Sequence, residues 1–200
     1  SRDGVPTEEF SVHPGGDMQL DPRDGASIYD MIDAALAPMR FGDDVEKTRS
    51  IWCTGRVLVF NLILYQWDGA TQRTRFNAAL LDDPISFPVE GLDMARYVQR
   101  PAPSEVFDLV GAVLFLSYGN GGHYVAATYH ELSRCWFLFD DDTVERLDSL
   151  EAYVAEERAV PTILFYRRRP AAARRPRAPW YITKRGPIWD HQLLEPQIEF

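Results

Sequence analysis

The feature of this 200-residue sequence that most limits its fold is a set of apolar, β-branched and aromatic runs separated by short turns. The longest, "FDLVGAVLFLSYG" from Phe107 to Gly119, has no helix-period gaps and is typical of a buried strand. "HYVAATYHEL" and "RCWFLFDD" follow as an expected antiparallel pair, and "PTILFYRRR" as a final strand. Few segments have helical spacing. We therefore predict an α+β fold with a mixed, mainly antiparallel sheet and few helices.

The first half of the chain predicts further strands and a helix. "RVLVFNLILYQW", from Arg56 to Trp67, predicts one long, mostly buried strand, and Asp68-Gly69 a turn after which "TQRTRFNAAL" returns as its partner. Ser27 begins a helix, because Asp30 completes a capping-box pattern and apolar residues follow at helical spacing. Pro38 ends this helix. A second, short helix is expected in "SLEAYVAEE".

The composition supports a folded domain and limits its chemistry. Hydrophobic residues make up 46% of the chain, which is enough for one domain with its own core. The two cysteines cannot form a disulfide framework, and no CxxC or Cys/His cluster suggests zinc, so we expect neither a metal nor another cofactor. No apolar stretch approaches the roughly eighteen residues of a membrane span. We therefore expect no membrane association.

The cysteine usage and the N-terminus bear on the compartment. A chain with two unpaired cysteines suits a reducing environment. The N-terminus has no charged-then-apolar signal pattern, and the sequence does not begin with Met, so we expect that something upstream was removed or is not included. We predict an intracellular protein, in the cytoplasm, in the nucleus or, if a presequence has been removed, in an organelle such as the mitochondrion.

Three segments of the chain differ in composition. Residues 1–25 are rich in Gly, Pro and Asp and predict an extended lead-in, whereas residues 26–169 carry the strands. Residues 170–200 contain prolines and aromatic residues without a steady period and predict a docking tail. The net charge of the chain is −9, yet every charged residue from 167 to 189 is Lys or Arg. Such a basic segment either lies on the acidic body or contacts a partner, of which RNA is one alternative. The candidate contact residues are Arg167, Arg168, Arg169, Arg174, Arg175 and Arg177.

Four stretches of the strand-rich segment, in this order along the chain, carry a resemblance to a known protein family: "FPVEGLDMARYV", "FDLVGAVLFLSYGNGGHYVAATY", "CWFLFDDDTV" and "PTILFYRRR". Together they resemble the C-terminal half of the ubiquitin-specific proteases, the papain-like deubiquitinases. The resemblance covers about Arg56 to Arg169, and Ile28–Leu36 is similar to the helix before the fingers of that family. It implies that residues 26–169 form the palm half of such a catalytic domain.

The resemblance also implies functions for individual positions. His123 matches the catalytic histidine of the family, which deprotonates the cysteine thiol. Asp140 matches the residue that orients this histidine, and Asp141 matches the neighbouring polar position. A histidine needs such a partner to fix its tautomer and ring orientation. The glycine loop that in the family lies near the C-terminal tail of ubiquitin, where glycines let a peptide backbone pass closely, is matched by Gly119, Gly121 and Gly122.

The chain lacks the nucleophile motif of the family, an Asn-x-Gly-Asn-Thr-Cys box. Cys53 precedes a strand and has no Asn or Gly upstream to build an oxyanion hole. Cys135 alternates with Phe137 and Phe139 along a strand, which indicates packing. We expect neither cysteine to act as a nucleophile.

Other features of the family are replaced as well. The paired CxxC zinc knuckles of the fingers are absent, which leaves at most a stub between Phe41 and Arg56. The usual Leu-Lys-Arg-Phe strand end reads Leu-Ile-Leu-Tyr at residues 62–65, and the usual His-Ser-Gly reads Phe-Leu-Ser at residues 115–117. At these positions, polar residues that are usual in the family are thus replaced by apolar or small residues.

A base without a nucleophile cannot carry out covalent acyl transfer. We therefore predict a ubiquitin-specific-protease-like module that is inactive by itself and acts as a structural or protein-interaction subunit of a larger assembly. Two alternatives stay open. The chain is the C-terminal half of an active cysteine deubiquitinase, which hydrolyses ubiquitin isopeptide bonds and whose Cys-bearing part is missing here or supplied by another chain. Or it is an RNA-contacting subunit of a ribonucleoprotein through its basic tail. Ubiquitin binding is left open, because the fingers that grip ubiquitin in the family are missing.

Overall fold

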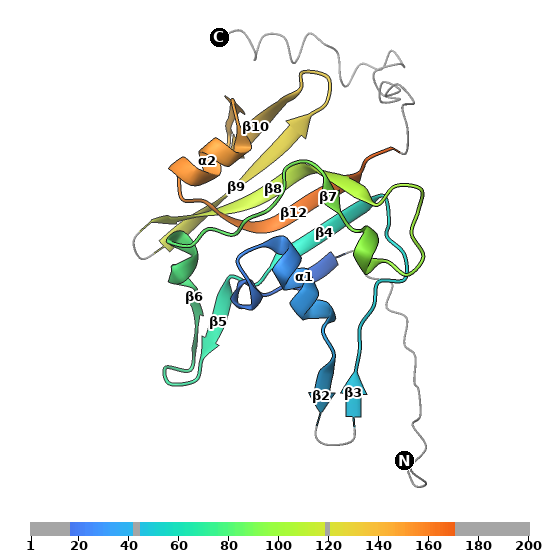
Figure 1. The fold of residues 1–200 in the computed structure, drawn as a ribbon. Coiled ribbons are helices and arrows are strands. Elements are labelled where there is room, and N and C mark those ends of the chain that lie inside the picture. The colour runs from blue at the N-terminus through green and yellow to red at the C-terminus, as the bar shows by residue number, and fades with distance from the viewer. Residues whose placement is uncertain (1–16, 42–44, 119–120, 171–200) are drawn as a thin grey trace, which may run out of the picture. The chain divides into compact units, whose positions relative to one another are not determined.

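The computed structural model describes residues 17–41, 45–118 and 121–170 (Figure 1). Several expectations from the sequence lie outside the described residues. They concern the first sixteen residues of the lead-in, the docking tail beyond Pro170, and the site candidates Gly119, Arg174, Arg175 and Arg177.

One eight-stranded sheet organises the fold (Figure 1). Its strands follow the order β1-β4-β12-β8-β9-β10-β11, with β7 paired separately to β8. Only β1 and β4 run parallel, and the other described pairs in this sheet are antiparallel. The predicted α+β fold class is confirmed. The strands are β1 (Asp17–Leu20), β4 (Val57–Leu62), β7 (Leu92–Asp93), β8 (Val106–Tyr118), β9 (Gly121–His130), β10 (Cys135–Asp140), β11 (Thr143–Leu147) and β12 (Val160–Arg168).

Two short hairpins extend away from this sheet (Figure 1). One pairs β2 (Met39–Phe41) with β3 (Val45–Lys47), and the other pairs β5 (Tyr65–Asp68) with β6 (Arg73–Phe76). The long strand expected from residue 56 to residue 67 is therefore two strands. The amide of Ile63 still donates to Leu20 of β1, but the carbonyl of Leu64 accepts from Asn77 after β6, so the chain leaves the sheet at this point.

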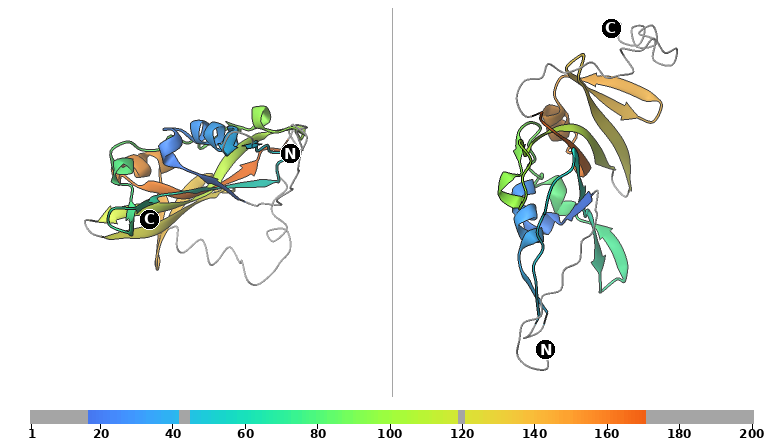
Figure 2. Two further views of the ribbon diagram at one scale, coloured as in Figure 1. Left: turned by 90° about the horizontal axis from the view of Figure 1, so that it is seen from below. Right: turned by 90° about the vertical axis from the view of Figure 1, so that its right-hand side faces the viewer.

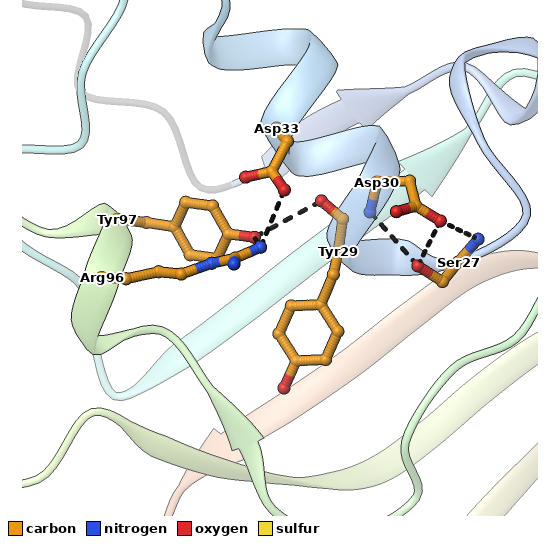
Figure 3. Close-up of polar contacts among 6 residues, drawn as sticks. All are labelled: Ser27, Tyr29, Asp30, Asp33, Arg96 and Tyr97. Carbon is orange, nitrogen blue, oxygen red and sulfur yellow. Dashed lines mark hydrogen bonds and ion pairs between the residues drawn. The ribbon is translucent and has the colours of Figure 1, made fainter.

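The helix α1 (Ile28–Leu36) begins as predicted. The Ser27 hydroxyl accepts from the amide of Asp30 at 3.2 Å, and the Asp30 carboxylate accepts from the amide of Ser27 at 3.1 Å, which completes a capping box (Figure 3). Its apolar stripe packs against the face of the sheet that it covers in Figure 2, where Met31 and Ile32 are fully buried.

Arg96 fastens the outer side of α1 to the segment after β7. This residue lies in the 3₁₀ helix η3 (Ala95–Tyr97), and its guanidinium donates to Asp33 of α1 at 2.7 Å. The same guanidinium lies 4.6 Å from the ring centroid of Tyr97 and 5.7 Å from that of Tyr29 (Figure 3). Charge and cation–π contacts therefore hold the two segments together.

The core lies between α1 and the middle strands. Phe60 and Tyr166 meet edge to face with their ring centroids 5.7 Å apart, and the buried Tyr166 hydroxyl donates to the carbonyl of Pro88 at 2.7 Å. Burial raises the pKa of Tyr166, since a phenolate would lose its hydration there. Leu20 of β1 is also fully buried. Residues 17–24, expected to belong to the lead-in, are thus part of the folded module, as β1 and the 3₁₀ helix η1 (Pro22–Asp24).

The second half of the module also contains the predicted short helix, α2 (Leu150–Glu156), which Ser149 caps by accepting from the amide of Ala152 at 3.1 Å. A further 3₁₀ helix, η2 (Ala78–Leu81), follows β6. Among the described residues, no helix has the length and apolar character required to span a membrane.

Candidate functional site

The register of the sheet determines where His123 lies. β9 runs antiparallel to both neighbours, with His123 opposite Leu116 of β8 and Ala126 opposite Phe139 of β10. The beginning of β9 therefore meets the end of β10. This pairing brings His123 to Asp140, which lies seventeen residues further along the chain.

His123 and Asp140 form a direct pair. The ring Nε2 lies 2.5 Å from Asp140 Oδ1, and the side chain of His123 is 34% exposed. This hydrogen bond is the main reason that the pKa of His123 is raised above its ordinary value, with smaller contributions from the charges of Asp140 and Asp141 and an opposing effect of burial. A neutral ring that donates from Nε2 presents Nδ1 as a base. The arrangement is thus an oriented general base on the surface of the sheet.

Asp141 follows in the turn that joins β10 to β11. Its backbone has a positive φ of 48°, a left-handed conformation that Asp tolerates better than most residues. The ligand atoms of Asp141, Asp140 and His123 all lie within 4.8 Å of one another. The structure therefore brings the three predicted residues together at one point.

Cys135 lies too far from His123 for its thiol to be deprotonated by the imidazole ring. It begins β10, and Asp140 ends the same strand five residues later, which separates the two by about 17 Å along the strand. The thiol is buried, and its sulfur lies 3.0 Å from the hydroxyl of Ser133. The Ser133 hydroxyl in turn lies 2.7 Å from Nδ1 of His130. Cys135 is thus held in a separate cluster at the opposite end of the hairpin.

Cys53 lies near the far end of β12. The neighbouring Thr54 carbonyl accepts from Arg168, the last residue of β12, at 2.8 Å. The first residue of β12, Val160, pairs with Phe115, next to the strand position opposite His123. The eight residue steps from Val160 to Arg168 span about 27 Å. The exposed Cys53 and the imidazole ring of His123 therefore lie near opposite ends of β12, too far apart to meet.

The two described glycines before His123 lie in different surroundings. A β-carbon on Gly121 would meet nothing within 4 Å, whereas a β-carbon on Gly122 would lie 2.1 Å from the ring of Phe115. Phe115 also packs against Tyr124 and Phe76, with ring centroids 5.1 and 4.9 Å away. The ring of Phe115 thus occupies the space that a side chain at position 122 would take, while Gly122 itself is exposed.

Sequence reasoning missed this aromatic cluster. Phe115 was seen only as a replacement for a polar residue, and its partners Tyr65 and Phe76 come from the β5–β6 hairpin. The signal available in the sequence was the change from His to Phe beside a glycine loop. Without the hairpin, nothing indicated where that ring would lie.

Three of the arginines expected to make tail contacts lie among the described residues, and all three form ion pairs within the folded module. Arg167 pairs with Glu131, and Arg169 pairs with Asp108 at 2.5 Å. Arg168 lies 3.5 Å from the buried carboxylate of Glu105. Of the two alternatives for the basic segment, these pairs agree with contact to the acidic body, because residues 160–168 form a central strand whose end faces acids of neighbouring segments. An RNA contact through these arginines would have to compete with those pairs.

A histidine oriented by an aspartate on the edge of two paired strands is an arrangement that can act as a general base. Residues 29–166 match the family model described as "Ubiquitin carboxyl-terminal hydrolase". This match extends over well more than half of the chain, and the chain belongs to this family. The family inferred from the strand landmarks is thereby confirmed.

Curated relatives show the same membership over part of their length. The chain is 30% identical over 124 residues to ubiquitin carboxyl-terminal hydrolase 4 of Bos taurus, which covers 62% of this chain and 12% of that protein. It is 33% identical over 135 residues to ubiquitin carboxyl-terminal hydrolase 3 of Mus musculus, which covers 64% of this chain and 24% of that protein. The chain thus spans a quarter or less of these relatives.

Solved structures confirm the fold. The Ubp8-Sgf11-Sgf73-Sus1 SAGA DUB module contains a chain that is 26% identical, with a TM-score of 0.67, over 84% of this chain and 37% of that one. The SAGA DUB module bound to monoubiquitin contains one that is 25% identical, with a TM-score of 0.63, over 78% of this chain and 36% of that one. The sheet described above is therefore the sheet of a deubiquitinase-family catalytic domain.

Proposed function

We propose that this chain is a deubiquitinase-family module that does not hydrolyse ubiquitin conjugates by itself and serves as a protein-interaction subunit of a larger assembly. The observation that carries the proposal is the position of the two cysteines. His123 is oriented as a base, but Cys135 and Cys53 are held about 17 Å or more away by the strands that carry or neighbour them. A chain in this arrangement has no thiol of its own to activate.

The β2–β3 hairpin supports the interaction part of the proposal. All six residues of its two strands are exposed, including Phe41 and Val45, which face each other across the ladder with exposed fractions of 56% and 58%. An isolated two-stranded hairpin is marginally stable in water. Packing against another subunit would bury these side chains. The similar structures named above are themselves modules of several subunits.

The test uses a ubiquitin probe with a thiol-reactive C-terminus on the purified full chain. We expect no covalent adduct with the wild type and no difference between the wild type and His123→Ala. Co-purification of the tagged full chain from cells would then identify its stable partner chains. An adduct mapped by mass spectrometry to Cys53 or Cys135 would contradict the proposal, as would a chain that releases a fluorophore from the ubiquitin C-terminus unaided.

One observation favours a second candidate function. The His123–Asp140 pair keeps a hydrogen-bonding geometry suited to catalysis, and a third of the His123 side chain is accessible. A Cys-bearing part that is missing from this sequence, or one supplied by a separate polypeptide, would complete a thiol hydrolase site by presenting a cysteine to this ring. In that case the ubiquitin probe labels another chain of the native assembly, and His123→Ala abolishes this labelling while the assembly stays intact. We further propose an intracellular location, in keeping with the two free cysteines.

A further inference from the structure

We propose that His123, Asp140 and Asp141 bind a divalent transition-metal ion such as Zn²⁺. These side chains form the one group of three potential metal ligands that the described residues bring together, and their ligand atoms lie within 4.8 Å of one another. Two ligands about 2.1 Å from a common ion are at most about 4.2 Å apart, so a small side-chain rotation closes the site.

The donor set selects the kind of ion. One imidazole nitrogen and two carboxylate oxygens suit Zn²⁺ and related divalent ions, whereas Ca²⁺ and Mg²⁺ prefer oxygen ligands alone and Cu⁺ prefers sulfur. The side chains of His123 and Asp140 are 34% and 47% exposed, so water can supply the remaining coordination positions. The site is thus open on one side, as in a metal site with three protein ligands.

The backbone holds two of the ligands before any ion arrives. His123 and Asp140 are fixed by the pairing of β9 with β10, and their ring nitrogen and carboxylate oxygen already face each other at 2.5 Å. The ion replaces the proton on Nε2, which passes to solvent, and the two atoms then separate to about 3 Å. Asp141 belongs to the exposed turn, where its carboxylate can swing toward the ion.

The electrostatic surroundings favour a cation. Within the described part of the chain, no Lys or Arg forms an ion pair with Asp140 or Asp141. A dication placed between Asp140 and Asp141 would be attracted by both carboxylates.

The inference rests on the proposed function in one respect: it requires that no cysteine sulfur of this chain contacts the imidazole ring of His123. It adds a ligand class that the sequence did not indicate. The ligand spacing His123, Asp140, Asp141 matches no linear metal motif, because the site forms only when β9 and β10 pair.

Isothermal titration of the full chain with ZnCl₂ at neutral pH tests the proposal. We expect one saturable site, weakened by at least about tenfold in His123→Ala, since even the loss of outer-shell partners costs about 10–100-fold in affinity. Asp141→Asn should weaken binding as well, and its exposed position makes it safe for folding. His130→Ala is the matched control, because His130 lies at the other end of β9 and bonds Ser133; it should bind as the wild type does.

The visible spectrum of bound Co²⁺ provides a second readout, expected in the wild type and lost in His123→Ala. The proposal is overturned if no saturable binding occurs, or if His123→Ala and Asp141→Asn bind Zn²⁺ as tightly as the wild type. These results are independent of the ubiquitin probe. Labelling of Cys53 or Cys135 would overturn the proposed function, whereas an unchanged titration in the variants would overturn the metal site alone.

Discussion

The ring of Phe115 lies 2.1 Å from the point where a β-carbon on Gly122 would stand. Glycine at this position therefore serves the packing of a neighbouring aromatic side chain. Phe115 in turn packs against Tyr65 and Phe76 of the β5–β6 hairpin, while Gly122 itself remains exposed.

Gly122→Ala should destabilise the module by about 1–3 kcal/mol, the usual cost of forcing extra volume into a packed site. The added methyl group would clash with Phe115 and would lie 2.8 Å from the backbone carbonyl of Leu116, which cannot move without disturbing β8. Urea unfolding measures the effect. Gly121→Ala is the matched control, because nothing lies within 4 Å of its β-carbon position, and it should change stability by about 0.5 kcal/mol or less. Equal effects of the two substitutions would contradict this packing.

The pair of His123 with Asp140 should make stability depend on pH. Its hydrogen bond raises the pKa of His123 above the ordinary value of 6.5. The protonated ring is therefore favoured in the folded state, and this stabilisation is fully present below pH 6.5 and lost as the pH rises through the raised pKa. Asp140→Asn should thus lose more stability at about pH 6 than at about pH 9, as measured by urea unfolding.

NMR titration of the ring reports the same effect directly. The pKa of His123 should fall in Asp140→Asn and stay unchanged in Asp142→Asn, since Asp142 is not among the groups that shift it. A wild-type His123 that titrates at or below 6.5 would show that the hydrogen bond does not form in solution.

Glu105→Ala should cost about 3 kcal/mol or more of stability, because removing one partner of a buried ion pair leaves an uncompensated charge. The Glu105 side chain is 2% exposed, accepts from the amide of Ala102 at 2.5 Å and pairs with Arg168. Glu131→Ala is the matched control. Its pair with the adjacent Arg167 is about half exposed on both sides and should contribute about 1 kcal/mol or less. A similar loss in both variants would mean that Glu105 is hydrated.

The two cysteines should differ in reactivity. Under native conditions iodoacetamide should modify Cys53, which is exposed, and spare Cys135, which is buried on β10. Mass spectrometry of the time course distinguishes the two sites, and in urea both should react. Rapid native modification of Cys135 would show that the end of the β9–β10 hairpin opens readily and that its thiol is not confined.

Much of the module could be read from local pattern. The capping box at Ser27 and Asp30 involves residues three apart, so its atoms meet whenever the helix forms. The long apolar runs around Leu114 and Leu164 can be buried only inside a sheet, which made β8 and β12 predictable. The meeting of His123 with Asp140 followed from a single antiparallel hairpin, β9–β10, whose register the alternation of side chains sets.

The rest depended on contacts between distant segments. The strand break after Leu62 is decided by β1, which pairs with β4 and ends there, and a continuous apolar run carries no mark of it. The ion pair of Arg168 needs Glu105, which lies more than sixty residues earlier in the chain. Such pairings are selected by the whole sheet and not by neighbours in sequence.

The amino-acid sequence by itself determined the helices α1 and α2 and the strands β8, β9, β10 and β12, and that a histidine and an aspartate would face each other across one hairpin, because those outcomes need only short-range periodicity and a single turn. Tertiary structure alone decided that both thiols lie far from the imidazole and that the ring of Phe115 lies against Gly122. Those distances are set by how separate strands stack into one sheet, and no local pattern encodes them.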